Sequence, residues 1–116
     1  MAVGWWTAGT GHSTRKAGDV AKERAFCRRY LGTDGRAIHW DFIRAVESSV
    51  ACLAILPLQD LLGLGSAARM NRPGSPRGNW TWRFRWADLR PGLRRRLREL
   101  TTVFGRAADP AIPAGR

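Results

Sequence analysis

One short stretch of the sequence limits the possible folds more than any other. Residues 54–58 (Ala-Ile-Leu-Pro-Leu) form an apolar run that stops abruptly at Gln59 and Asp60. Such a run predicts a strand buried on both faces, as in a parallel sheet, and Pro57 is tolerable near its end. A lone strand cannot satisfy its own edges. The sequence therefore indicates either an α-rich exception or a piece of a larger α/β fold.

Two helices are predicted before this strand. The first spans residues 20–31, with Asp19 as its N-cap and Gly32 as the residue that follows its last turn. The second opens after Gly35 and keeps one apolar helical face through residues 42–53. A helix followed by a buried strand is half of a βαβ unit, which favours the α/β alternative.

The pattern changes after the strand. Residues 66–78 are rich in Gly, Pro, Ser and Asn and predict a loop. Aromatic residues then alternate with polar ones over 80–86, which predicts an extended segment with one aromatic face. Pro91 suits the first turn of a last helix that ends at Gly105. That helix carries an apolar stripe made of Leu93, Leu97, Leu100 and Phe104.

The chain is strongly basic, with 20 Lys and Arg against 9 Asp and Glu and a formal net charge of +11. This charge permits a polyanionic partner without requiring one. A basic Arg/Trp-rich module for single-stranded nucleic acid is therefore an alternative function, because bases stack on aromatic rings. The arginines of the last helix could bind phosphate, although a solvated face is the more usual explanation.

Other classes of protein are disfavoured. The apolar run 50–58 is far shorter than the roughly 20 residues that cross a bilayer, so we expect no membrane association. The N-terminus has no secretory pattern, so we expect a cytoplasmic protein. Cys27 and Cys52 form neither a disulfide framework nor a metal motif, and His12 and His39 have no spaced partner. We expect no metal and no cofactor.

Several stretches in one order carry a family resemblance. Residues 30–32, 38–40, 56–65, 68–74 and 78–83 together resemble the C-terminal end of 4-alpha-glucanotransferases, also called amylomaltases or disproportionating enzymes. The resemblance runs from about residue 4 to residue 105. It is most specific in the motifs Pro-Leu-Gln-Asp-Leu-Leu-Gly-Leu-Gly, Ala-Arg-Met-Asn and Gly-Asn-Trp.

The resemblance implies a fold. It is the C-terminal piece of a (β/α)8 TIM-type barrel, comprising the last strand, its loop and the flanking helices, and it is α-rich in isolation. A complete barrel needs about 250 residues. On this basis residues 1–18 are an irregular N-terminal segment, residues 19–106 are the barrel part, and residues 107–116 are a flexible tail.

The resemblance also implies an activity. The family transfers α-1,4-glucan segments between maltooligosaccharides with retention, using a carboxylate nucleophile and a second carboxyl group as acid and base. Both lie on earlier barrel strands, and a third carboxylate lies in a His-Asp-Asn-Asp-Thr motif shortly before Gly-Trp-Trp. Here Gly4-Trp5-Trp6 follows only Met1, Ala2 and Val3. We therefore expect no catalytic residue in this chain and no activity of the chain alone.

Four residues are candidates for substrate binding. Gln59 and Asp60 follow the predicted strand, where barrel enzymes bind ligands. Asn71 offers both a donor and an acceptor to sugar hydroxyls, and the ring of Trp80 can stack on a sugar. Structural alternatives stay open: Asp60 could cap a turn, and Trp80 could fill a junction. The expected partners are an α-1,4-glucan or maltooligosaccharide and, as a further possibility, a separate N-terminal barrel part; nucleic acid is disfavoured.

Overall fold

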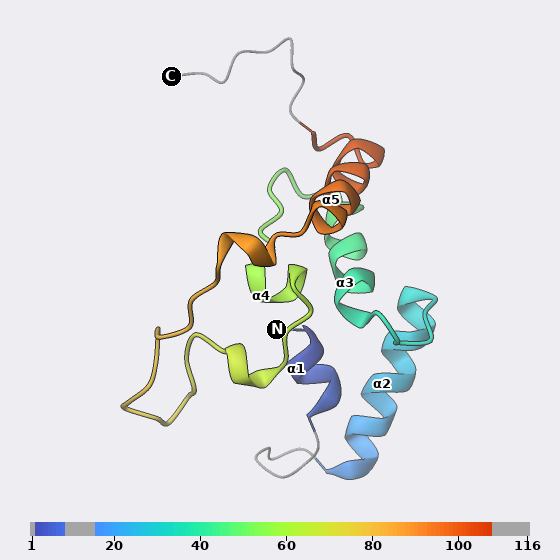
Figure 1. Cartoon of the computed structure of the whole chain (residues 1–116). Helices are drawn as coiled ribbons and strands as arrows, with labels where there is room; N and C mark the ends of the chain where they lie inside the picture. The colour runs from blue at the N-terminus through green and yellow to red at the C-terminus, as the bar shows by residue number, and fades with distance from the viewer. Residues whose placement is uncertain (1, 9–15, 108–116) are drawn as a thin grey trace.

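The structure of the chain is a computed structural model, which describes residues 2–8 and 16–107. Helices separated by long connections make up this part of the chain (Figure 1). In chain order they are α1 (Ala2–Thr7), α2 (Ala17–Leu31), α3 (Ile38–Glu47), α4 (Leu58–Leu61), the 3-10 turns η1 (Ser66–Ala68) and η2 (Trp86–Asp88), and α5 (Pro91–Val103).

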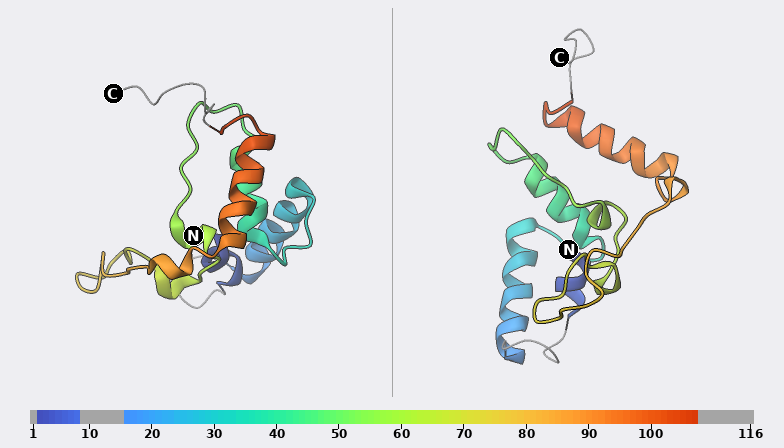
Figure 2. Two further views of the ribbon diagram at one scale, coloured as in Figure 1. Left: turned by 45° about the horizontal axis from the view of Figure 1, so that its top comes forward. Right: turned by 90° about the vertical axis from the view of Figure 1, so that its left-hand side faces the viewer.

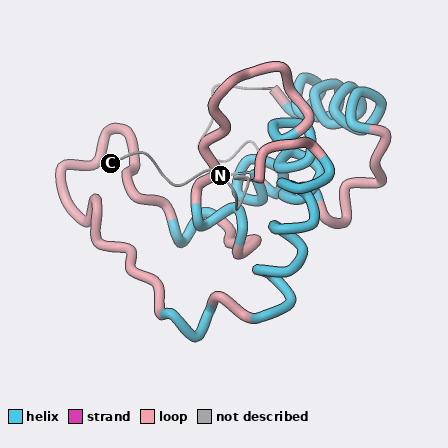
Figure 3. Tube along the Cα trace, turned by 90° about the horizontal axis from the view of Figure 1, so that it is seen from above, coloured by secondary structure: helices cyan, strands magenta, loops and turns pink. Residues whose placement is uncertain are grey.

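The predicted strand at residues 54–58 does not form. Figure 3 shows only helices and loops over the described residues, and the chain passes from residues 48–57 directly into α4. A strand needs neighbours to pair with, and none of the described segments lies along this one as a strand. Leu53 and Ile55 consequently remain 69% and 78% exposed. The prediction of a strand at residues 54–58 is therefore wrong for the described residues, whereas the expectation of an α-rich chain is confirmed.

The helix ends follow local sequence signals in part. Gly32 adopts a left-handed conformation with φ 63° directly after α2, and Pro91 is the first residue of α5, as predicted. Asp19 lies inside the first turn of α2 instead of capping it, where its charge still favours the positive end of the helix. The prediction that the second helix continues to Leu53 is wrong, because α3 ends at Glu47.

The N-terminal segment 1–18, expected to be irregular, contains the helix α1. Packing explains this difference, because six residues cannot form a stable helix by propensity alone. Trp5 contacts Phe42 of α3 edge-on, with 6.0 Å between ring centroids. Trp6 lies so close to Gly35 that a side chain at Gly35 would collide with its ring. His12 and the predicted tail beyond residue 107 lie outside the described residues.

The core is small for a chain of this size. The buried apolar residues are Val20, Ile38, Trp40, Ile43 and Ala68. The accessible surface is 9146 Å², whereas a folded monomer of 12.9 kDa exposes about 6,300 Å². The radius of gyration is 16.6 Å, against about 13 Å for a compact domain of this length (Figure 2). The helices therefore leave much apolar surface that a self-sufficient domain would bury.

One arginine ties the end of α5 to the connection after α3. The guanidinium of Arg106 donates hydrogen bonds to the carbonyl oxygens of Glu47, Ser49 and Ala51 at 2.6, 2.8 and 2.8 Å. It also lies 3.9 Å from the carboxylate of Glu47, a side chain that is 4% exposed. Arg106 thus fixes the point at which residues 48–57 leave the helical body.

Candidate functional site

Residues 69–80 form a loop that is closed by its own hydrogen bonds. The side chain of Asn79 accepts a hydrogen bond from the amide of Arg72 at 2.8 Å and donates one to the carbonyl of Ser75 at 2.7 Å. The amide of Trp80 donates to the carbonyl of Met70, which brings the two ends of the loop together. In Figure 1 this loop extends away from the helices. Local contacts therefore give Asn71 and Trp80 defined positions.

The base of this loop borders a groove of about 410 Å³. Trp5 of α1, Gln59 of α4 and Asn71 of the loop all line it, so three separate elements contribute. Sequence reasoning named Gln59 and Asn71 as candidates, and the structure brings both to the same groove. Asp60 and Trp80 are not among its lining residues. The groove offers amide groups, an indole and one cation, Arg69, which together suit a polar ligand rich in hydrogen-bonding groups.

The two polar residues of α4 have different surroundings. Gln59 is buried, and its amide nitrogen donates to the carbonyl of Ala68 at 3.4 Å, a long hydrogen bond that orients the side chain. Asp60 accepts a hydrogen bond from the amide of Ala2 at 2.6 Å. This contact ties α4 to the start of α1. Asp60 therefore has a structural role. The sequence also makes it a candidate for substrate binding.

Trp80 has an unusual backbone conformation. It is the one non-glycine residue with positive φ, 59°, among those the structure describes, and it is 65% exposed. A large side chain in this region costs of the order of 1–3 kcal/mol, and such strain tends to occur at functional sites. The side chain of Arg83 supports the conformation by donating to the carbonyls of Trp80 and Trp82 at 2.8 Å.

The aromatic residues after Trp80 share one face, as their alternation predicted. The ring of Trp82 stacks on that of Phe84 with 6.4 Å between centroids, and Phe84 meets Trp86 edge-on at 5.3 Å. No ladder hydrogen bonds accompany this segment among the described residues. Side-chain contacts alone therefore order the aromatic face, and Trp86 remains largely exposed.

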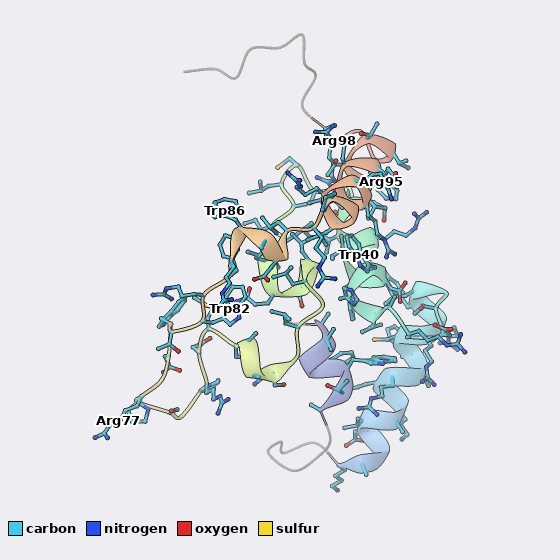
Figure 4. The ribbon with its side chains drawn as sticks, in the orientation of Figure 1. Trp40, Arg77, Trp82, Trp86, Arg95 and Arg98 are labelled. Atoms are coloured by element: carbon cyan, nitrogen blue, oxygen red, sulfur yellow. The ribbon has the colours of Figure 1, made fainter. Side chains whose placement is uncertain are left out.

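A second and larger cavity, of about 800 Å³, was not anticipated from the sequence. Helices α3, α4 and α5 and the aromatic segment contribute to it, and Arg96 lies over the ring of Trp40 at 4.1 Å from the centroid. Figure 4 shows Trp40 beside α5. Burial and the positive charge of Arg96 lower the pKa of His39, outweighing the opposite effects of Asp60 and Asp41. Arg96 is itself exposed, as a solvated face of α5 predicts, and it borders the cavity from that side.

From the sequence we also expect no metal ion and no membrane association. Over residues 2–8 and 16–107, no three His, Cys, Asp or Glu side chains gather in a way that could bind a metal ion. None of the described helices is both long and apolar enough to cross a membrane.

The chain is similar to proteins of known activity. A family model described as 4-alpha-glucanotransferase matches residues 1–89. The 4-alpha-glucanotransferase of Synechocystis sp. is 51% identical over 78 residues, which cover 66% of this chain and 15% of that protein. The enzyme of Thermus thermophilus is 39% identical over 110 residues, covering 90% of this chain and 20% of the enzyme. The chain thus spans a fifth or less of the length of these relatives.

A solved structure is similar as well. The amylomaltase from Streptococcus agalactiae in complex with acarbose superposes with a TM-score of 0.70 and 31% sequence identity, covering 74% of this chain and 18% of that one. None of these similarities supports the nucleic-acid alternative.

Proposed function

The chain belongs to the 4-alpha-glucanotransferase family, and from this premise we propose that it forms the C-terminal, glucan-binding part of such an enzyme. The convergence of Gln59 and Asn71 on one groove is the observation that carries the proposal. The amide groups there donate and accept hydrogen bonds, as sugar hydroxyls require, and the groove residues carry no catalytic carboxylate.

The proposed reaction divides the work between this chain and the rest of the enzyme. A carboxylate outside the matched segments attacks the donor glucan and forms a glycosyl-enzyme, and a second carboxyl group protonates the leaving chain. The residues of this chain bind and orient. Gln59 and Asn71 hold sugar hydroxyls, Trp80 offers its ring to a sugar face, and Asp60 accepts from a hydroxyl if its bond to Ala2 is exchanged.

We further propose that residues 53–57 become the last strand of a barrel when neighbouring strands are present. Apolar side chains are exposed on this segment, as expected for a strand whose neighbouring strands and covering helices are absent. Among the described residues, none of the amides of residues 50–56 donates a backbone–backbone hydrogen bond. The missing strands would come from an N-terminal barrel part, on the same polypeptide or a separate one.

The location of the protein stays a prediction. The enzymes of Synechocystis and Thermus carry no compartment in their names, whereas the Arabidopsis thaliana relative is named chloroplastic/amyloplastic. A cytoplasmic location is our proposal for this chain, and fractionation of its source cells would test it.

A chimeric enzyme tests the proposed binding role. In this chimera, the present chain replaces the matched C-terminal segment of the Thermus thermophilus relative. Asn71→Ala is expected to raise the KM for maltotriose about fivefold, because a hydrogen bond to a neutral group contributes about 1 kcal/mol, with kcat changed less than twofold. Arg77→Ala, at the exposed tip of the same loop (Figure 4), is the control and should leave KM unchanged. Equal effects of the two substitutions would exclude Asn71 from substrate binding.

The same chimera tests the role of Arg106. Arg106→Leu leaves the buried carboxylate of Glu47 without its cation and frees three carbonyl oxygens. Such a loss costs about 3 kcal/mol, and we expect the half-life of thermal inactivation to shorten at least tenfold. Arg36→Leu removes an exposed ion pair with Asp34 and should change the half-life less than twofold. An unchanged half-life for Arg106→Leu would refute the anchoring role.

A further inference from the structure

The 800 Å³ cavity between α3, α4 and α5 has a charge that the handling of neutral glucans does not explain. Arg83, Arg90 and Arg96 line it, together with a single acidic residue, Asp88. The carboxylate of Asp88 accepts a hydrogen bond from the amide of Arg85 at 2.9 Å and so closes the turn η2. Among the described residues, none of the three arginines forms an ion pair. The lining of this cavity therefore carries an excess of positive charge, while the carboxylates of Asp41 and Glu99 lie on the other side of Arg96 and line a neighbouring pocket with it.

The backbone adds to this positive potential. Helix α5 begins at the cavity, where Gly92 and Leu93 belong to its first turn. No side chain caps this end of α5, and its first turn contains no acidic residue. A side chain added at Gly92 would meet open space. The positive end of the helix dipole is thus directed at the same region as the arginines, which favours an anion there.

The walls of the cavity also suit a ring. Trp82, Leu61 and Leu64 line it beside the arginines, so apolar and cationic surfaces lie next to each other. A volume of about 800 Å³ exceeds what an inorganic anion fills and is in the range of small-molecule sites. Guanidinium groups bind phosphate oxygens in pairs, and an indole packs on the apolar face of a sugar.

We propose that this cavity binds a sugar phosphate, with the phosphate held by Arg90 and Arg96 and the sugar ring placed against Trp82. The site is separate from the groove of Gln59 and Asn71, so it does not rest on the proposed glucan-binding role. A sugar phosphate is an anionic relative of the units of the neutral polymer. Its binding beside α3 and α5 would stabilise the packing of Arg96 on Trp40.

Calorimetric titration of the 116-residue chain at constant ionic strength tests the proposal, with glucose 1-phosphate, inorganic phosphate and maltose as probes. Glucose 1-phosphate should bind saturably, at least tenfold more tightly than maltose and at least threefold more tightly than inorganic phosphate. Binding should also increase the helical circular dichroism, because a ligand of the folded state stabilises it. Absence of saturable binding, or equal binding of maltose, would overturn the proposal. Equal binding of inorganic phosphate would overturn the proposed contact between the sugar ring and Trp82.

Charge-matched variants locate the site. Arg90→Gln should weaken the binding of glucose 1-phosphate at least fivefold, and Arg90→Gln with Arg96→Gln at least twentyfold. The control is Arg94→Gln with Arg98→Gln, which removes two charges from another face of α5 and should change affinity less than twofold. The side chain of Arg90 makes no capping hydrogen bond to α5, so Arg90→Gln is expected to retain the fold. This single variant therefore still tests the site if the loss of Arg96 disrupts the fold. Equal loss in the control, or displacement of the ligand by an oligothymidylate, would contradict a sugar phosphate site.

Discussion

A polypeptide of these 116 residues is expected to release no glucose from maltotriose above the uncatalysed rate. By the family resemblance, the nucleophile and the acid/base belong to strands outside the segments that this chain matches. Carboxylates in the described part have structural contacts instead. Glu47 lies beside Arg106, Asp60 accepts from Ala2, and Asp88 closes a turn. Loss of both chemical roles removes of the order of 10⁶-fold in rate.

The measurement is glucose release from maltotriose, followed with a coupled glucose assay. The chimera with the Thermus thermophilus relative is the positive control, because it combines this chain with the part of that enzyme that this chain does not match. It is expected to turn over at a rate typical of enzymes, about 1–10³ s⁻¹. Turnover in that range by the 116-residue polypeptide would show that it carries its own catalytic carboxylates.

The second large effect concerns stability. The 116-residue polypeptide should lose its helical signal gradually on heating, without a cooperative transition, and should bind a hydrophobic dye at low temperature. Its accessible surface exceeds that of a folded monomer of the same mass by about 2,800 Å², and large apolar side chains such as Leu53, Ile55 and Trp86 are exposed. Calorimetry combined with sedimentation equilibrium tests this expectation. A sharp two-state transition of a monomer would contradict it.

One substitution tests whether Ile55 belongs to an interface or to ordinary solvent-exposed surface. Ile55 is 78% exposed, so Ile55→Gln should leave the helical content of the isolated chain unchanged and reduce dye binding. In the chimera the same side chain is expected to lie inside a barrel, where a buried amide without a partner costs about 3 kcal/mol. Loss of stability in the chimera alone is the predicted pattern. Equal behaviour in both backgrounds would show that Ile55 is simply exposed.

The helices could be predicted where their ends depend on single residues. Gly32 and Gly105 adopt the left-handed conformation after α2 and α5, and Pro91 starts α5. Helix α1 could not be predicted, because it depends on the contact of Trp5 with Phe42, 37 positions later. The apolar run 54–58 has the composition of a buried strand, yet a strand depends on partners, and the described residues supply none. The composition of this segment therefore predicts a strand that needs neighbouring strands, and the described residues contain none.

The sequence predicts two of the four candidate site residues to be where the structure brings them together. Gln59 and Asn71 meet at one groove, whereas Asp60 is used to hold α1 and Trp80 lies elsewhere. The family was identified from short motifs and is confirmed by the family model and the relatives. The cavity around Arg96 could not be found, because it depends on α3 and α5 packing across 56 residues of sequence. Charge patterning predicts a solvated Arg96, which is exposed in the structure, and so gives no sign of the cavity beside it.

The central claim is that residues 53–57 are the last strand of a barrel whose neighbouring strands are absent from the described part of this chain. Amide hydrogen exchange of this segment tests it most directly, measured in the 116-residue polypeptide and in the chimera. We expect these amides to exchange close to the intrinsic rate in the polypeptide, since none of them donates a backbone–backbone hydrogen bond among the described residues. In the chimera they should exchange at least 100-fold more slowly, because ladder hydrogen bonds protect them. Equal exchange rates in the two proteins would contradict the claim.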